Sequence, residues 1–177
     1  MSSFSQRIIG AAKLDAAIYE EVEADSGALG QAMAVVVLSS LAAGIGSIYY
    51  AGFWSGLLLG TLAALMGWVV WAFMTWFIGT KLLPEPQTEA DMGQLLRTIG
   101  FAAAPGILRV FGIIPGIGGL IVLACSLWML AAMVVGVRQA LDYQSTWRAV
   151  GVCVIGWVVL LVFQLLVLSL LSPAQLS

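Results

Sequence analysis

Few residues in this chain could do chemistry, and those few are far apart in the sequence. The chain has no histidine, the side chain most often used as a general base and as a metal ligand. Its two cysteines, Cys125 and Cys153, lie inside apolar runs without the neighbouring ligands that a zinc site needs. The sequence therefore predicts two small buried side chains, no metal site and no bound cofactor.

The carboxylates do not form a catalytic group either. They lie in the amino-terminal segment, between Pro84 and Asp91, and at Asp142, always outside the long apolar runs. The glycines form neither the Gly-x-Ser-x-Gly turn of a hydrolase nor the Gly-x-x-x-x-Gly-Lys loop that holds phosphate groups. We therefore predict that the protein has no catalytic residues and is not an enzyme.

Arg109 and Gln164 are the polar side chains that stand out inside the apolar runs. A charged side chain at membrane depth is costly, so Arg109 either extends to the interface, pairs locally, or binds a ligand or partner. Gln164 is suited to a hydrogen bond with a neighbouring helix. No carboxylate lies in an apolar run, which argues against a proton-coupled carrier.

The composition indicates which solvent surrounds these residues. Hydrophobic residues make up 62% of the chain and charged residues 9%, whereas a soluble domain has about 25% charged residues. The formal net charge of -2 comes without a basic patch, which argues against nucleic-acid binding. The chain is therefore predicted to be a polytopic integral membrane protein, with the lipid bilayer as its first partner.

The apolar runs predict an all-α integral membrane protein built as a bundle of five transmembrane helices. A crossing needs ~20 apolar residues, and the tyrosines and glycine within 49–52 suit a turn at the interface. The predicted crossings are residues 29–48, 53–78, 99–115, 118–137 and 149–171, followed by a tail at 172–177. The third contains Pro105, and a re-entrant loop is the alternative to a full crossing.

The basic residues favour the five-crossing arrangement. If the third segment crosses, every basic residue except Arg109 falls on one side of the membrane, namely Arg7, Lys13, Lys81, Arg97, Arg138 and Arg148. The positive-inside rule makes that side cytoplasmic, so we expect a cytoplasmic amino terminus and an external carboxyl terminus. A re-entrant third segment would move Arg138 and Arg148 to the outer side.

Residues 1–28 form an amphipathic segment ahead of the first crossing. Phe4, Ile8 and Ala12 recur at helical spacing, and Ile18 and Val22 repeat the pattern. This spacing predicts one or two short helices on the cytoplasmic face of the membrane. The alternative is a loose tail with chance periodicity.

Small residues predict where the second crossing packs. Gly56, Gly60 and Ala64 are spaced four residues apart, and such rows let two helix backbones approach closely. Packing inside the monomer is one interpretation. Self-association into a homo-oligomer is the other.

Three stretches of the sequence resemble the Yip family, membrane proteins named for their interaction with Ypt/Rab GTPases. They are Leu-Asp-Ala-Ala-Ile-Tyr-Glu-Glu-Val-Glu at 14–23, Leu-Arg-Thr-Ile-Gly-Phe-Ala-Ala-Ala-Pro-Gly at 96–106, and the run at 128–143 that ends in Arg-Gln-Ala-Leu-Asp-Tyr. The resemblance is to the bacterial branch and implies a five-helix bundle in the bacterial inner (cytoplasmic) membrane. Eukaryotic members of the family act in vesicle trafficking and membrane organisation, and the bacterial branch has no settled biochemical role to carry over.

We therefore expect a non-enzymatic scaffold or adaptor that organises membrane or recruits a protein partner of unknown identity at the cytoplasmic face. Ion pairs between acidic and basic side chains could dock the amino-terminal segment beneath the bundle. The candidate partner surface consists of Asp15, Glu20, Glu21, Glu23, Arg97, Arg138, Asp142 and Arg148. The arginines could instead serve only as topology anchors. A small transporter or channel, or an accessory subunit of a larger membrane complex, is the alternative function.

Overall fold

The fold is given by a computed structural model of the chain, which describes residues 2–46 and 53–171, with the backbone alone at 53–59, 163–164 and 166–171. All regular structure in these residues is helical. In chain order the elements are α1 (Phe4–Ala12), α2 (Ala16–Ala24), η1 (Ser26–Ala28), α3 (Leu29–Gly46), α5 (Phe53–Phe77), η2 (Ile78–Leu82), α6 (Met92–Ala102), η3 (Ala104–Ile113), α7 (Gly118–Ala140) and α8 (Thr146–Leu171).

Four stretches of helix are long and apolar enough to cross a bilayer. They are Ser26–Gly46, Gly60–Leu82, Met92–Ile113 and Gly118–Ala140. A shorter apolar stretch, Thr146–Val162, lies within α8. The predicted all-α integral membrane protein is thus confirmed as an all-helical chain with four long apolar helices and a shorter one.

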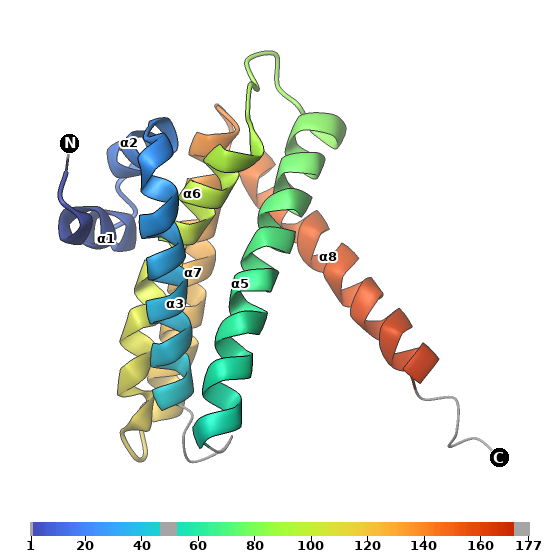
Figure 1. Cartoon of the computed structure of the whole chain (residues 1–177). Helices are drawn as coiled ribbons and strands as arrows, with labels where there is room; N and C mark the ends of the chain where they lie inside the picture. Colours follow the sequence, from blue (N-terminus) through green and yellow to red (C-terminus); the bar gives the residue numbers. More distant parts are fainter. Residues whose placement is uncertain (1, 47–52, 172–177) are drawn as a thin grey trace.

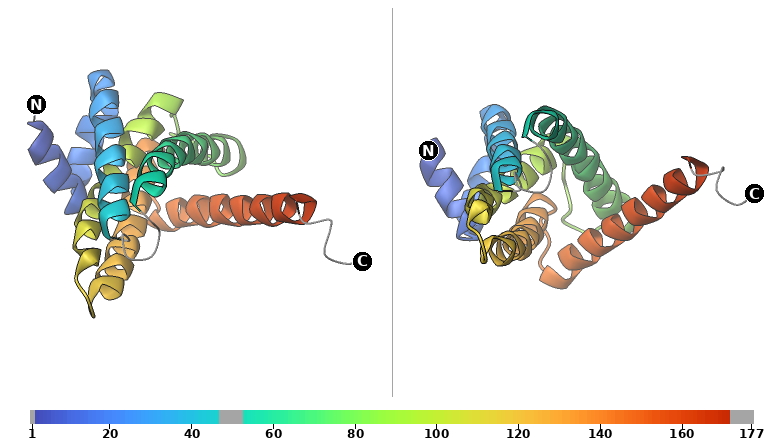
Figure 2. Two further views of the ribbon diagram at one scale, coloured as in Figure 1. Left: turned by 60° about the horizontal axis from the view of Figure 1, so that its bottom comes forward. Right: turned by 90° about the horizontal axis from the view of Figure 1, so that it is seen from below.

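Three helical rods lie side by side and α5 packs along them (Figure 1). These rods are α3, the composite of α6 and η3, and α7, with η3 packed between α3 and α7. Helix α8 starts beside the carboxyl end of α5 and then diverges from it, so its far half projects away from the bundle (Figures 1 and 2). The bundle therefore has a closed side around η3 and an open side between α5 and α8.

The apolar rod that corresponds to the predicted third crossing begins earlier in the chain than the sequence predicts. The expected span was 99–115, whereas the apolar rod runs from Met92 to Ile113. Asp91 and Gln94 form a capping box at its start, with each side chain accepting from the other residue's backbone N–H. Only Ala103 separates α6 from η3, so the apolar rod also includes residues 92–98, ahead of the predicted span.

The rod changes from α-helix to 3₁₀-helix at Ala103, two residues before Pro105. Proline has no backbone N–H and does not suit the interior of an α-helix, whereas it is accepted in the first turn of a new helix. Gly116, with a φ of +84°, then reverses the chain into α7. The segment is thus a helical rod that is long and apolar enough to cross a bilayer.

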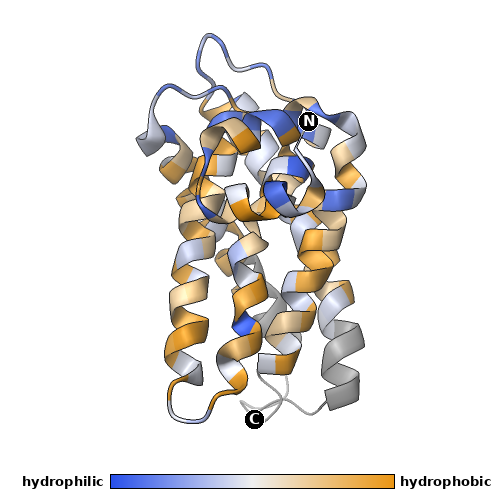
Figure 3. Ribbon diagram, turned by 90° about the vertical axis from the view of Figure 1, so that its left-hand side faces the viewer, coloured by the Kyte–Doolittle hydropathy of each residue, from blue (hydrophilic) through white to orange (hydrophobic). Residues whose placement is uncertain are grey.

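The amino-terminal segment folds into two helices instead of a loose tail (Figure 3). Ser3 and Gln6 form a capping box at the start of α1, and the Asp15 side chain caps α2. Tyr19 is fully buried, and its hydroxyl donates to the carbonyl oxygen of Ala11 at 3.2 Å. Both helices pack on α6, and α2 also packs on α7, so the segment belongs to the folded structure.

A polar link holds the connection between α5 and α6 against the turn between α7 and α8. The hydroxyl of Tyr143 donates to the carbonyl oxygens of Leu83 at 2.7 Å and Gly79 at 3.1 Å. Arg148 pairs with Glu85 at 3.2 Å. The Tyr143 hydroxyl thus satisfies carbonyl groups near the end of η2 that would otherwise lack partners. These bonds fix the loop that follows η2.

Candidate functional site

All nine acidic residues of the chain lie at one end of the molecule. This charged end consists of residues 2–28, 81–97 and 138–148, which gather at the hydrophilic end of the bundle (Figure 3). Hydrogen bonds join its three segments: Gln94 donates to Glu23, Gln139 to Glu20, and Gln87 to the carbonyl of Asp142. The sequence predicted that these charges share one side, and the structure brings them together.

Arg7 is the most deeply buried charge of this end, with 2% of its surface exposed. Its guanidinium pairs with Glu21 at 2.9 Å and with Asp25 at 2.8 Å. Hydrogen bonds from Ser2 and from Arg7 lower the pKa of Glu21 to about 2, so this carboxylate stays ionised. Sequence reasoning treated Arg7 only as a topology marker. The sequence places Arg7 on the same predicted helix as Phe4 and Ile8. It does not show that Arg7 will lie next to Glu21 after folding.

Arg97 holds the carboxyl end of α2. Its guanidinium donates to the carbonyl oxygen of Val22 at 3.0 Å and to that of Glu23, and the side chain is 8% exposed. The last carbonyls of a helix lack partners within the helix and carry partial negative charge. These carbonyl groups therefore compensate the positive charge of the buried Arg97 guanidinium without a carboxylate.

Arg138, another residue of the candidate partner surface, bonds to residues that are close to it in the sequence. Arg138 donates to the carbonyl oxygens of Tyr143 at 3.1 Å and Gln144 at 3.3 Å, which closes the turn after α7. The expected ion pairs of Asp15, Glu20, Glu21 and Glu23 with Arg97, Arg138 and Arg148 are therefore wrong. The docking of the segment is real, but it depends on Arg7 and on backbone carbonyls, whose directions only the folded chain defines.

Glu23 differs from the other carboxylates of the charged end. Burial, and secondarily the negative charge of Asp142, raise its pKa from 4.5 to about 7, against an opposing effect of Arg97. It accepts a hydrogen bond from Gln94 at 3.0 Å. Glu23 is therefore the acidic side chain here whose charge changes near neutral pH.

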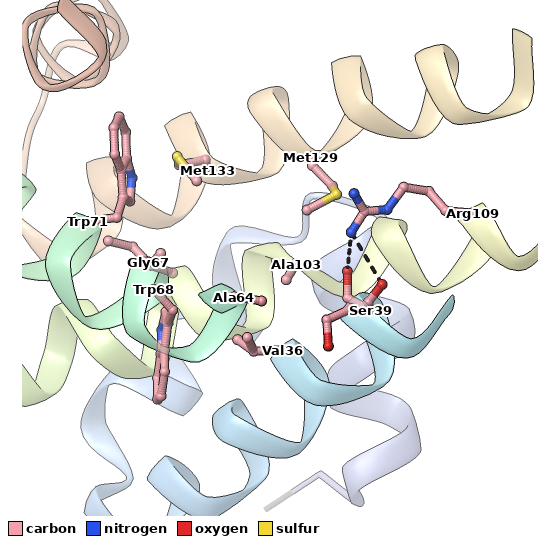
Figure 4. A pocket seen from close by; sticks show the side chains of 12 residues that line it. Val36, Ser39, Ala64, Gly67, Trp68, Trp71, Ala103, Arg109, Met129 and Met133 are labelled. Atoms are coloured by element: carbon pink, nitrogen blue, oxygen red, sulfur yellow. Dashed lines mark hydrogen bonds between the residues drawn. The ribbon is translucent and has the colours of Figure 1, made fainter. Parts of the chain in front are cut away.

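Arg109 lies in the apolar part of the bundle and is held by oxygen atoms of α3 and of its own helix, η3 (Figure 4). One terminal nitrogen donates to the hydroxyl of Ser39 at 2.9 Å and to its carbonyl oxygen at 3.2 Å. The Nε atom donates to the carbonyl oxygen of Gly106 at 3.2 Å. No carboxylate within the described residues forms an ion pair with Arg109.

Arg109 lines two adjoining cavities. The inner cavity, of about 220 Å³, lies among α3, α5, α6, η3 and α7 and also contacts Ser39 and Trp68. The outer cavity, of about 800 Å³, lies among α5, α7 and α8. Trp71 lines both, is 7% exposed, and its indole N–H has no acceptor among the described residues.

The row of small residues does not pack as predicted at its centre. Gly60 is exposed, and in the described part of the chain no atom lies within 4 Å of where its Cβ would be. Ala64 is half-buried and lines the inner cavity. Among the described residues Gly60 therefore makes no close helix contact, whereas Ala64, four positions further on, faces the inner cavity. Gly56 and Gln164 lie outside the residues whose side chains are described.

A comparison with protein families matches the Yip1 domain to residues 16–168. The chain belongs to the Yip1 domain family. Comparisons with curated proteins and with solved structures find no match.

The Yip1 domain match extends from the first turn of α2 into the last turns of α8. It therefore includes Arg97, Arg109 and both cavities, whereas α1 with the buried Arg7 precedes it. In this Yip1 domain protein no group of three or more Cys, Asp or Glu side chains among the described residues is arranged to hold a metal ion. The features that call for explanation are thus the charged end and the cavities at Arg109.

Proposed function

We propose that this Yip1 domain protein is a non-enzymatic membrane scaffold or adaptor that recruits a protein partner at its charged end. The observation that carries the proposal is an imbalance between buried and exposed charge. Arg7 and Arg97 are buried, and Arg138 bonds to nearby carbonyls. Exposed carboxylates remain on the surface, namely Asp15, Glu20, Glu89, Asp91 and Asp142.

This imbalance favours a partner with a basic surface. The exposed cations of the same end are Lys13, Lys81 and Arg148, and Arg148 is paired with Glu85. Complementary charge steers association and orients a partner more than it adds affinity. An acidic surface is also repelled by anionic lipid headgroups, which leaves it available to a protein.

The proposal includes an orientation. The basic residues gather at the charged end, and basic residues are enriched on the cytoplasmic side of membrane proteins. We therefore assign the charged end to the cytoplasm. A scaffold of this kind needs no catalytic group, since recruitment depends on shape and charge alone.

Charge reversal at exposed carboxylates that form no ion pair and no helix cap in the described structure tests the proposal. The variant Glu20→Lys with Glu89→Lys should insert normally but recover at least about tenfold less partner by affinity purification from native membranes, because steering and orientation are lost. The matched control, Lys13→Glu with Lys81→Glu, changes the same number of exposed charges and should retain the partner. Recovery of every partner in normal yield by the Glu20, Glu89 variant would refute recruitment through the carboxylates.

A small transporter is a second candidate, supported by the cavities that reach Arg109. Interrupted helices often build transport sites, and the rod from Met92 to Ile113 changes helix type at Ala103. The cavities are lined mostly by apolar side chains, which suits an amphiphile better than a hydrated ion. Flux of small anions through proteoliposomes that contain the purified protein would support transport over recruitment.

A further inference from the structure

The outer cavity is a groove along α7 that lies between the two diverging helices α5 and α8. Because α8 leaves α5 after its first turns, the groove is open on one side of the bundle (Figures 1 and 2). Large apolar side chains that line it are also exposed on the outside of the described chain, namely Met66, Val70, Leu130, Trp157 and Leu161. In a membrane protein, a groove with such walls is accessible to the helices of neighbouring proteins.

Arg109 brings a positive charge to this groove at the middle of the apolar rods. Its guanidinium lies beside Met129, the twelfth of the 23 residues of α7 (Figure 4). Bonds to Ser39 and to the carbonyl oxygen of Gly106 hold it at this depth, so it does not extend to the membrane interface. These acceptors are neutral, and its second terminal nitrogen has no acceptor among the described residues. A charged side chain inside a membrane usually pairs with a group of opposite charge.

A second copy of this chain has no counter-charge to offer at that depth. Its nine acidic residues lie at 15–25, at 85–91 and at Asp142, all at the charged end. The phosphate group of a lipid does not reach this depth either, because headgroups lie outside a hydrocarbon layer of about 30 Å. The carboxylate that matches Arg109 therefore belongs to the membrane-spanning part of another protein.

Helix α5 offers a place for close helix approach at the same groove. Gly67 lines the groove and is exposed, and no described atom lies within 4 Å of where its Cβ would be. Gly60, two turns earlier on the same face of α5, is equally open. Small residues let two helix backbones approach closely in lipid. Since Gly67 and Arg109 line one groove, a helix that packs on Gly67 reaches Arg109 with one of its side chains.

From these observations we infer that the groove binds a transmembrane helix of a different protein, which carries an aspartate or glutamate near the middle of its apolar run. That carboxylate accepts from the second terminal nitrogen of Arg109, and the helix packs on Gly67 and on the adaptable side chains of Met129 and Met133. The buried N–H of Trp71 does not depend on this helix. Trp71 also lines the inner cavity, whose volume of about 220 Å³ has room for water molecules as acceptors.

This binding site lies within the bilayer and is separate from the charged end. The inference therefore does not depend on recruitment through the exposed carboxylates, and either one can fail without the other. The two sites also select different chemistry. The charged end favours a basic surface in water, whereas the groove favours an acidic side chain in an apolar helix.

A synthetic transmembrane peptide tests the site directly. The peptide is a leucine–alanine helix of about 20 residues with one glutamate at its centre, and its matched form has glutamine there. Energy transfer between the labelled peptide and the labelled full chain in phosphatidylcholine vesicles at pH 8 measures association. The wild type should bind the glutamate peptide at least about tenfold more strongly than the glutamine peptide. Arg109→Gln should remove this preference. Arg148→Gln, at the charged end, is the matched control and should keep it.

The variant Gly67→Leu separates helix binding from the bonds that Arg109 makes within the monomer. The leucine side chain would enter open space, so the variant should insert and melt like the wild type. It should block close approach of the peptide and reduce binding of the glutamate form to the level of the glutamine form. Gly30→Leu, at an equally open position on α3, is the control and should bind like the wild type.

The depth of Arg109 gives a further test. Moving the glutamate two turns away from the centre of the peptide should remove the preference, because the carboxylate then misses Arg109. Equal binding of the central glutamate and glutamine peptides by the wild type would overturn the proposal. So would an unchanged preference in both Arg109→Gln and Gly67→Leu. Energy transfer between two labelled copies of the chain that Gly67→Leu abolishes would identify a second copy as the occupant, and would also overturn it.

Discussion

The guanidinium of Arg97 in α6 donates to the main-chain carbonyl oxygen of Val22 in α2, across 3.0 Å. The same group also bonds to the carbonyl of Glu23, so one side chain satisfies two carbonyls at the end of a helix. Val22 itself is fully buried against the bundle. A polar contact surrounded by apolar ones thus attaches the amino-terminal segment to α6.

Replacing Arg97 by Met should loosen α1 and α2 while the transmembrane rods stay folded. Loss of hydrogen bonds from a charged group should lower the free energy of unfolding by about 1.5–3 kcal/mol. Hydrogen–deuterium exchange should rise across residues 4–24. Arg148→Met is the control, since the Arg148 side chain is 48% exposed in its pair with Glu85 and pairs open to solvent contribute about 0–1 kcal/mol. Unchanged exchange in the Arg97 variant would show that apolar contacts suffice.

Glu23 should make the stability of the charged end fall as the pH rises from 4.5 to about 7. Its pKa is raised from 4.5 to about 7, so the folded state binds more protons than the unfolded state between these values. Stability then decreases with increasing pH across this window, because the unfolded state loses its proton first. Below pH 4.5 the contribution is constant, and above about pH 7 the loss is complete.

The variant Glu23→Gln should abolish this pH dependence. Glutamine keeps an oxygen that can accept from Gln94 but has no charge to bury. Thermal unfolding in detergent, measured from pH 4.5 to 7.5, should give a flatter profile for the variant than for the wild type. Glu21→Gln serves as the comparison, because the pKa of Glu21 is lowered to about 2 and its contribution disappears only at acid pH. Matching slopes for wild type and Glu23→Gln would contradict the assignment.

Gly100 and Gly60 should respond oppositely to the same substitution. A Cβ on Gly100 would lie 2.7 Å from the Cβ of Ala32 and 3.2 Å from its backbone, which cannot move away like a flexible side chain. Gly100→Ala should therefore destabilise the protein by about 1–3 kcal/mol through overpacking. Gly60→Ala meets no atom of the described chain within 4 Å and should be neutral or stabilising by up to ~1 kcal/mol. Equal melting temperatures in detergent would contradict the close approach of α6 to α3.

Five crossings with termini on opposite sides are expected from the distribution of basic residues. Reporter fusions after Asp91 and after Tyr143 should give cytoplasmic signals, and a fusion at Ser177 an external one. The fusion after Tyr143 also tests whether the rod from Met92 to Ile113 crosses fully, since a re-entrant rod would move that turn to the outer side. A cytoplasmic signal at Ser177 would rule out an odd number of crossings.

Hydropathy alone was enough to predict the class of this protein and most of its helices. Backbone groups in lipid must bond within their own segment, so a long apolar run has little choice but helix. The apolar helices from Leu29 and Gly118 start where the sequence predicted. The gathering of charge at one end also followed from the sequence, because charged side chains are excluded from the hydrocarbon layer.

The tertiary structure alone decided which groups meet. Arg97 bonds to carbonyls of α2 and Arg7 to Glu21 and Asp25, whereas the sequence suggested carboxylate partners for Arg97. Residue types state which charges are available but not where backbone carbonyls point after two helices dock. Likewise, Arg109 stood out from the sequence as a polar residue in an apolar run. Its groove depends on the divergence of α5 and α8, a long-range packing relation that local periodicity does not contain.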